Sequence, residues 1–307
     1  MKFITFMKKD GSVCAGWVNS RNMAVDMHDA SNGWLPDNML SFIENHERYM
    51  EYIEGNKGLI ETSNSSYPMD EVVLKAPLPN PKSVRDFYAF EQHVKTARKN
   101  RGLEMIPEWY EMPVFYFTNH LAIKGTEEEI PRPRACEWLD FELEIACVIG
   151  KEGRNIKSED ADKHIFGFFI MNDWSARDLQ RQEMKVGLGP AKGKDFATSI
   201  GPYLITMDEL EFRKAGKGYD LEMAARVNGV EISRGNMKDL YYSFGEMIER
   251  ASAGTTLYPG EVIGSGTVGT GCILELGTGV HRWLEPGDEV ELEITELGIL
   301  RNKIIED

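Results

Sequence analysis

The chain has 307 residues, of which 42% are hydrophobic and 28% charged, a composition typical of globular proteins. Acidic residues outnumber basic ones by 50 to 35, so the formal net charge is −15 at pH 7. This excess of negative charge argues against a nucleic-acid partner, because phosphate binding needs clustered lysine and arginine side chains. If the protein acts on an anion, its site must carry local basic groups.

The N-terminal residues lack the sustained apolar segment and cleavage site of a secretory signal, and no apolar run approaches the length of a membrane span. The cysteines Cys14, Cys136, Cys147 and Cys272 are scattered, without a C-x-x-C pair. We therefore expect a cytoplasmic protein with reduced thiols and no membrane partner. The same spacing disfavours a zinc site built on cysteines.

Residues 1 to about 75 differ from the rest of the chain and are predicted to form a small β-rich accessory domain. Short apolar segments at 3–6, 12–18 and 22–26, separated by turn residues, indicate three strands. Helical spacing follows over 38–55, and the polar segment 63–68 is interpreted as a linker. Prolines then lead into a second domain, predicted to cover residues 76–307.

Strand-like segments predominate after residue 76, and helical spacing appears at about 87–100, 174–182 and 238–252. We therefore predict a β-rich α+β protein without internal repeats. The predicted strands are 114–118, 141–149, 165–171, 201–205, 222–227, 262–265, 273–276 and 289–294.

The predicted strand 141–149 carries the most informative side chains. Phe141 and every second residue up to Ile149 form one apolar face, as a buried strand requires. Asp140, Glu142 and Glu144 fall on the opposite face, where three carboxylates repel one another unless they lie in water or share a cation. Taken alone, such a pattern is more often a solvated face than a metal site.

Two further acids strengthen the cation hypothesis. Asp86 follows the segment 83–85, and Asp173 closes the apolar segment 164–173, so both stand at predicted strand ends. Together with Glu142 and Glu144 they offer the oxygen ligands that a hard divalent cation prefers.

Taken in order, the motifs resemble the fumarylacetoacetate hydrolase family. The resemblance covers roughly residues 83 to 295 and implies a mixed β-sandwich roll preceded by a small N-terminal β domain. The matching motifs are Asp86-Phe-Tyr88 with Gln92-His93, Asp140-x-Glu142-x-Glu144, Asn172-Asp-Trp-Ser-Ala-Arg177-Asp-x-Gln180, Gly193-Lys194 with Thr198, Gly266-Thr267, and Leu274-Glu275-Leu276.

The resemblance implies a homodimeric, metal-dependent hydrolase that cleaves a C–C bond in a β-diketo acid such as fumarylacetoacetate or an acylpyruvate. The implied cofactor is Mg²⁺ or Mn²⁺, with Ca²⁺ as an alternative, and His93, oriented by Glu275, would activate a water. The implied metal-site residues are Asp86, Glu142, Glu144, Asp173, Lys194 and Thr198; the catalytic residues are His93, Glu275, Arg177, Gln180 and Lys194; the substrate contacts are Tyr88, Tyr116 and Thr267.

The sequence departs from the family's archetype in the substrate pocket. Met184 replaces a tyrosine, and the basic residues Arg98, Lys99 and Arg101 do not match the archetypal carboxylate-binding arginine. They are either a solvated helix face or a clamp for a substrate carboxylate. The family also contains decarboxylases and ketonising isomerases of oxaloacetate-like or hydroxyheptadienedioate-like diacids, which the metal ligands cannot distinguish from hydrolases. A non-enzymatic metabolite sensor is the third hypothesis.

Overall fold

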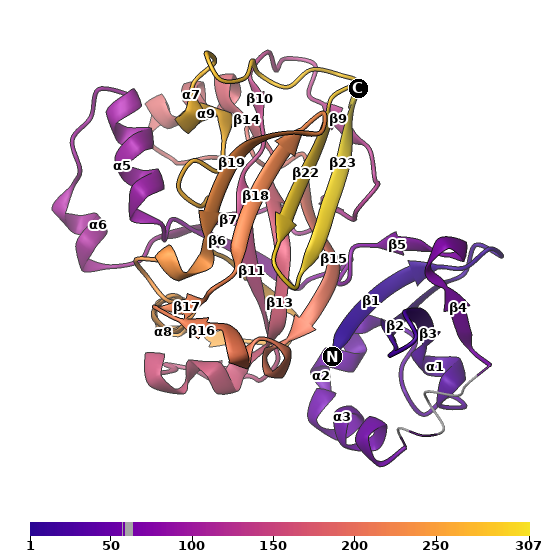
Figure 1. The fold of residues 1–307 in the computed structure, drawn as a ribbon. Helices are drawn as coiled ribbons and strands as arrows, with labels where there is room; N and C mark the ends of the chain where they lie inside the picture. The colour runs from indigo at the N-terminus through magenta and orange to yellow at the C-terminus, as the bar shows by residue number, and fades with distance from the viewer. Residues whose placement is uncertain (57, 59–63) are drawn as a thin grey trace.

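The computed structural model describes residues 1–56, 58 and 64–307, which form an α+β protein dominated by strands (Figure 1). The predicted fold class is confirmed. Two large sheets organise the chain, one of 12 strands and one of five. The strands of the larger sheet are β1 (Lys2–Met7), β2 (Val13–Val18), β3 (Met23–Asp26), β4 (Ser66–Pro68), β5 (Val73–Lys75), β6 (Ser83–Phe87), β7 (Phe115–Thr118), β8 (Ile123–Lys124), β11 (Leu143–Ile149), β13 (Ile165–Asp173), β15 (Thr198–Thr206) and β21 (Glu261–Gly264).

The larger sheet runs in the order β4-β3-β2-β1-β15-β13-β11-β21-β6-β7. Its centre is antiparallel, but β21 pairs in parallel with β6, so segments almost 180 residues apart in the chain lie side by side. This order places the C-terminal end of β13 next to the N-terminal end of β11. Only β21 separates β11 from β6 in the sheet.

The N-terminal strands continue this sheet, because β1 pairs with β15 through Lys2 and Phe3. The helices α1 (Met27–Ala30), α2 (Met39–Glu44) and α3 (His46–Gly55) accompany them in the lower right of Figure 1. The division at residue 75 stays a prediction. The expected linker 63–68 is partly wrong: residue 63 lies outside the described part, and Ser66–Pro68 pairs with β3, because Tyr67 packs its ring near Phe6.

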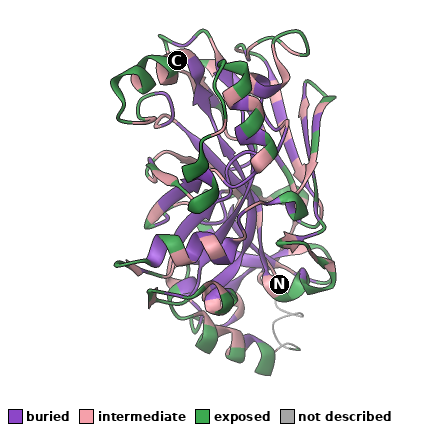
Figure 2. Cartoon of the chain, turned by 90° about the vertical axis from the view of Figure 1, so that its left-hand side faces the viewer, coloured by how far each residue is buried: buried purple, intermediate pink, exposed green. Residues whose placement is uncertain are grey.

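Strand β11 is covered on both faces. Phe141, Leu143 and Ile145 enter one hydrophobic cluster as predicted, whereas Ala146 and Val148 on the other face enter a second cluster that includes N-terminal residues. The face that carries Glu142 and Glu144 is therefore also buried, and Figure 2 shows buried strands through the middle of the molecule. Carboxylates in such a place require partners, because an unpaired buried charge is costly.

The five-stranded sheet, ordered β19-β18-β22-β23-β9, packs beside the centre of the larger one (Figure 1). Cis Gly201-Pro202 lies within β15. The strands of the smaller sheet are β9 (Ile130–Arg132), β18 (Glu222–Val227), β19 (Val230–Asn236), β22 (Glu289–Ile294) and β23 (Gly298–Glu306). Short paired strands complete the set: β10 (Leu139–Asp140) with β14 (Ser175–Ala176), β12 (Gly153–Arg154) with β20 (Thr256–Leu257), and β16 (Lys214–Ala215) with β17 (Gly218–Tyr219).

Several predicted helices begin later than expected. The segment before α7 is extended because Ser175 and Ala176 pair with β10, and α8 begins at a capping box formed by Ser243 and Glu246. The strand predicted at 273–276 is wrong, since these residues form a short helix. The remaining helices are α5 (Glu91–Asn100), α6 (Pro107–Glu111), α7 (Arg177–Val186), α8 (Phe244–Ser252) and α9 (Ile273–Leu276).

In the described part of the chain, no helix is both long and apolar enough to cross a membrane.

Candidate active site

Four buried carboxylates meet at the centre of the larger sheet. Asp86 comes from β6, Glu142 immediately precedes β11, Glu144 lies in β11, and Asp173 ends β13. One oxygen from each lies within 4.8 Å of the others. We call these four residues the acid cluster. The sequence prediction that these acids converge agrees with this geometry.

The sheet register explains why the acid cluster forms. Leu143 pairs with Asn172, and Gly264 of β21 stands between Ala146 of β11 and Asp86 of β6. A Cβ atom at Gly264 would lie 2.7 Å from Oδ1 of Asp86, closer than real Cβ contacts allow. A glycine in the intervening strand therefore leaves the space in which carboxylates from its two neighbours approach each other.

Two buried cations bind one side of the acid cluster. Lys194 Nζ lies 2.5 Å from Glu142 Oε2 and 2.6 Å from Asp173 Oδ2, and Arg177 Nη2 lies 2.7 Å from Glu142 Oε1. The hydroxyl of Tyr116 also donates to Asp173. Glu142 is thus the best-partnered carboxylate of the four.

A loop after α7 holds Lys194 in place. The Glu183 carboxylate accepts hydrogen bonds from the backbone N–H groups of Ala191, Lys192 and Gly193 at 2.6–3.2 Å. Gly193 is required there, since a Cβ atom would lie 2.7 Å from the backbone nitrogen of Gln180. The loop is therefore tied to the helix that carries Arg177 and Gln180.

The opposite side of the acid cluster has no such partners. Among the described residues, both carboxylate oxygens of Glu144, Oδ1 of Asp173 and the Thr198 hydroxyl are buried without a hydrogen-bond partner. Buried polar atoms are nearly always paired. A group that supplies positive charge would satisfy all of them.

The pKa shifts follow the same asymmetry. Burial, and then the charge of Asp86, raises the pKa of Glu144 well above its usual range, and burial with the charge of Asp173 does the same for Asp86. Burial also disfavours the Glu142 anion, but Lys194 and Arg177 outweigh it and lower the Glu142 pKa. Protons or a cation must therefore compensate the Glu144 side. The acid cluster is consistent with a divalent metal site, and metal uptake there would release protons.

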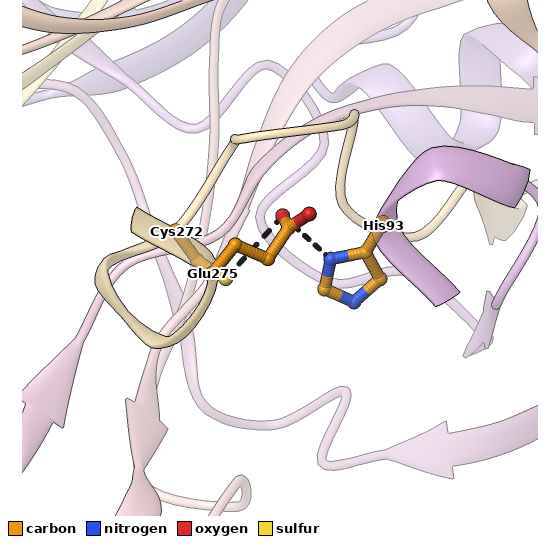
Figure 3. Close-up of side chains that lie close together, drawn as sticks. All are labelled: His93, Cys272 and Glu275. Carbon is orange, nitrogen blue, oxygen red and sulfur yellow. Dashed lines mark hydrogen bonds and ion pairs between the residues drawn. The ribbon is translucent and has the colours of Figure 1, made fainter. Parts of the chain in front are cut away.

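A second group of buried side chains is shown in Figure 3. His93 from α5 and Glu275 from α9 are both buried, and Nδ1 of His93 lies 2.7 Å from Oε2 of Glu275. The contact is short but does not have the alignment of a ring N–H hydrogen bond, so we describe it as an ion-pair contact.

Asp140 connects the two groups, although it lies outside the acid cluster. Its carboxylate accepts hydrogen bonds from the backbone N–H groups of Ile273 and Leu274 at 2.8 and 3.0 Å, and from Arg177 Nε at 2.9 Å. It thereby fixes the start of α9, which carries Glu275, to the arginine that binds Glu142. This role was missed from the sequence, where Asp140 was assigned only to the same face as Glu142 and Glu144.

The remaining predicted site residues surround these groups. Gln180 accepts a hydrogen bond from Arg177 Nη1 at 3.1 Å, and the Tyr88 ring packs edge-on against His93 with centroids 5.2 Å apart. Thr198 pairs with Asp173 across β15 and β13, and Thr267 is buried in the loop after β21, one residue beyond Gly266, whose N–H donates to Asp86. Met184 is 45% exposed on α7.

The basic residues after His93 have different environments. Arg98 donates to the Glu104 carbonyl at 2.5 Å, and Lys99 is exposed. Arg101 is exposed, yet its charge opposes the effect of burial, which raises the pKa of Tyr88 to about 12. Among these three, Arg101 therefore has the clearest electrostatic link to the site.

Comparison with known proteins identifies the family. A family model described as the C-terminal region of fumarylacetoacetate hydrolase matches residues 82–305. The chain belongs to the fumarylacetoacetate hydrolase family. Family membership makes it an enzyme that acts on a small molecule.

Individual family members share sequence over most of the chain. Human mitochondrial oxaloacetate tautomerase FAHD2A is 32% identical over 277 residues, covering 88% of this chain and 81% of that protein. Oxaloacetate tautomerase YisK of Bacillus subtilis is 33% identical over 250 residues, with 80% and 77% covered. Fumarylacetoacetase of Arabidopsis thaliana is 32% identical over 268 residues, with 67% and 63% covered.

Solved structures from the family have the same fold. Fumarylacetoacetate hydrolase from Exiguobacterium antarcticum superimposes with a TM-score of 0.74 at 25% identity, and all of both chains is covered. A 5-carboxymethyl-2-hydroxymuconate delta-isomerase from Mycobacterium smegmatis gives a TM-score of 0.70 at 25% identity, again with full coverage. The predicted fumarylacetoacetate-hydrolase-like fold is confirmed.

The unpaired side of the acid cluster can be tested with Glu144→Gln. This substitution should raise the melting temperature of the metal-free protein, because burying Glu144 requires either its protonation or an uncompensated charge, and a buried amide requires neither. The same variant should lose the stabilisation that Mg²⁺ or Mn²⁺ gives the wild type, about 2.7 kcal/mol at a hundred times the Kd. Thermal unfolding with and without metal measures both effects. Glu152→Gln, at an exposed position, is the control; equal metal stabilisation in both variants would contradict a metal site at Glu144.

Asp140→Asn tests the connection between Arg177 and α9. An amide can accept through only one of its two end atoms, so its NH₂ group would face donors that the carboxylate now binds. We expect destabilisation of about 3 kcal/mol, measured by urea unfolding, together with slower turnover. Asp220→Asn, which loses only exposed partners such as Lys238, should leave the unfolding midpoint nearly unchanged. Wild-type stability in Asp140→Asn would refute the connecting role.

Proposed function

We propose that this enzyme catalyses enol–keto tautomerisation of an α-keto diacid of the oxaloacetate class. The observation that carries the proposal is the buried His93–Glu275 pair, whose helix α9 is connected through Asp140 and Arg177 to Glu142 of the acid cluster. The pair provides a proton carrier, and the cluster provides a site for a cation that stabilises an enolate. The tautomerases named above match 80% or more of this chain, which favours this activity over the hydrolysis expected from the sequence.

The metal assignment extends the geometry of the acid cluster. Asp86, Glu142, Glu144 and Asp173 would hold Mg²⁺ or Mn²⁺, with Ca²⁺ as an alternative. The bound ion would supply Lewis-acid stabilisation of the negative charge that develops on the substrate's enolate oxygen. Lys194, whose pKa is raised by Asp173 and Glu142 against the effect of burial, remains an ammonium, so it would act as a neighbouring charge rather than a ligand. Thr198 would face the ion or its water.

His93 would move the proton. Its Nδ1 faces Glu275, while the other ring nitrogen points away from that carboxylate (Figure 3). That nitrogen would remove a proton from C3 of the keto acid, or return it there from the imidazolium. Glu275 would fix the ring orientation and stabilise the positive charge formed on the ring. When C3 loses a proton to His93, the substrate oxygen takes up one from solvent and the imidazolium later releases its own to solvent; the reverse direction returns both, so the composition of the substrate is unchanged.

Arg177, Gln180 and Lys194 would shape the charge around the reacting oxygens. Arg177 is buried and held by Asp140, Glu142 and Gln180, so its guanidinium is oriented before substrate arrives. Preorganised donors of this kind stabilise developing negative charge without reorganisation. Tyr88 and Thr267 would contact the substrate. Tyr116, proposed from the sequence as a third contact, already donates its hydroxyl to Asp173 and would act mainly on that carboxylate.

Arg101 would select the diacid. Its Nε donates to the Ala97 carbonyl oxygen at 3.0 Å, and a guanidinium has further N–H donors. Arg101 acts electrostatically on Tyr88, and the Tyr88 ring packs against His93. A substrate that reacts at His93 could therefore place its far carboxylate against the Arg101 guanidinium.

Hydrolysis of a β-diketo acid is the second candidate. The same His93–Glu275 pair would activate a water. The Arabidopsis thaliana fumarylacetoacetase matches 67% of this chain in sequence, and the Exiguobacterium antarcticum hydrolase superimposes on all of it. Decarboxylation of a diacid would need the enolate stabilisation but no activated water. The homodimer and the cytoplasmic location remain predictions; the human relative named above is described as mitochondrial.

The first test compares enol-oxaloacetate with acetylpyruvate and fumarylacetoacetate, with Mg²⁺ or Mn²⁺ and then with chelator. We expect fast, chelator-sensitive loss of the oxaloacetate enol absorbance without pyruvate release. His93→Ala should lower this rate by about 10²–10⁴-fold, the usual contribution of a general acid–base group. His120→Ala is the control, and it should retain the wild-type rate. Pyruvate or fumarate formed from a diketo acid at a comparable rate would instead support the hydrolase.

Arg101→Ala tests the substrate class. Loss of a hydrogen bond between charged groups costs about 1.5–3 kcal/mol, so KM for the diacid should rise roughly tenfold to a hundredfold with little change in kcat. Turnover of a monoacid, where detectable, should not change. Lys99→Ala, two residues before Arg101 at an exposed position of α5, provides the control. An unchanged KM in Arg101→Ala would remove this residue from the pocket.

A further inference from the structure

Cys272 joins His93 and Glu275 in a buried cluster of three different donor types (Figure 3). Its Sγ lies 3.7 Å from Glu275 Oε2, the same oxygen that lies 2.7 Å from His93 Nδ1. One ligand atom from each residue lies within 4.8 Å of the other two. The imidazole nitrogen, the thiol and the carboxylate thus converge on one volume.

The local structure holds this arrangement together. Cys272 and Glu275 stand three residues apart at the start of α9, a spacing that puts both side chains on one side of a helical turn. His93 approaches from α5, and the Asn100 side chain at the end of that helix donates to the backbone carbonyls of Leu274 and Glu275 at 3.1 and 3.3 Å. The three donors therefore come from two elements that are bonded to each other.

The donors suit a transition metal better than a hard cation. Zinc binds sulfur, nitrogen and oxygen at about 2.0–2.3 Å with tetrahedral geometry, which puts ligand atoms about 3.3–3.7 Å apart. The Cys272–Glu275 separation of 3.7 Å matches that range, whereas the His93–Glu275 separation of 2.7 Å is shorter, so the imidazole and the carboxylate would move apart when the ion binds. His93 is 5% exposed, and its Nδ1 has no aligned hydrogen-bond partner among the described residues. This nitrogen lies 2.7 Å from Glu275 Oε2 without the alignment of a hydrogen bond, an observation that does not depend on the cysteine.

We propose that His93, Cys272 and Glu275 form a second metal site, which binds Zn²⁺ and inhibits the enzyme by immobilising the proton-transfer pair. Zinc would gain bonds to the imidazole nitrogen, the carboxylate oxygen and the sulfur, while the thiol proton leaves to solvent. Thiolate and carboxylate together balance the two positive charges of the ion. A water completes the tetrahedron. The inhibition rests on the proposed role of His93; the binding does not.

This site differs in chemistry from the acid cluster. The four carboxylates offer only hard oxygen donors, which suit Mg²⁺ or Mn²⁺, whereas a thiolate and an imidazole favour zinc and cobalt. The sequence disfavoured a zinc site built on cysteines, because it contains no C-x-x-C pair. The fold instead recruits a single cysteine and a histidine almost 180 residues away.

The site can be tested with Co²⁺ as a spectroscopic probe and Zn²⁺ as the inhibitor, in full-length protein with Mg²⁺ in excess to occupy the acid cluster. The wild type should bind one Co²⁺ with a sulfur-to-metal charge-transfer band in the near ultraviolet, and Zn²⁺ should abolish both the band and turnover. Cys272→Ser should lose the band. Its half-inhibiting zinc concentration, measured against its own zinc-free rate, should rise at least about tenfold, because even indirect ligand partners contribute that much to metal affinity.

Cys14→Ser, which removes a buried thiol in the N-terminal strand β2, is the matched control and should keep the band and the wild-type zinc sensitivity. Cys272→Ala repeats the test without introducing a hydroxyl group. A charge-transfer band that survives in both Cys272 variants, or zinc inhibition equal to that of the wild type, would overturn the proposal and assign zinc to the acid cluster. A Cys272-dependent band without inhibition would confirm the site and instead refute the proposed role of His93.

Discussion

The central constraint on this protein is an excess of negative charge at its most buried point. The acid cluster and Asp140 supply five carboxylates, while Lys194 and Arg177 supply two positive charges, and all seven groups are buried. The cations are placed on one side, so Glu142 is well partnered and Glu144 is not. The fold must therefore be completed by protons or by a divalent ion, and the unsatisfied side is where a substrate oxygen could share that ion's charge.

The two cations also determine what surrounds the acid cluster. Arg177 reaches Glu142 and Asp140 together, and Asp140 holds the first turn of α9, which presents Glu275 to His93. Lys194 depends on the loop that Glu183 ties to α7. Charge compensation and the position of the proton carrier are thus achieved by the same few contacts. A change to one of these residues affects both the metal-binding and the proton-transfer parts of the site.

The sequence allowed much of this site to be predicted, for identifiable reasons. Glu142 and Glu144 follow a period-two pattern that only a strand produces, and the motifs around Asp86, Asp173 and Lys194 kept the order of the family. Asp140 could not be assigned in the same way, because the extended strand is interrupted between β10 and β11. The Asp140 carboxylate therefore faces Arg177 instead of the acid cluster. The four residues 273–276 alternate like a strand, yet Asp140 accepts their first N–H groups and they form a helix. Such effects depend on contacts between distant segments, which a local pattern does not contain.

The burial of both faces of β11 limits how this enzyme can be divided or recombined. Phe3, Trp17 and Phe42 from the N-terminal region share one hydrophobic cluster with Ala146, Met171 and Val262 from the strands around the acid cluster. A chain beginning after residue 75 would leave that apolar face open to water and the adjoining edge of β15 unpaired. Chimeras between relatives would therefore need to exchange the first 75 residues together with the side chains they cover.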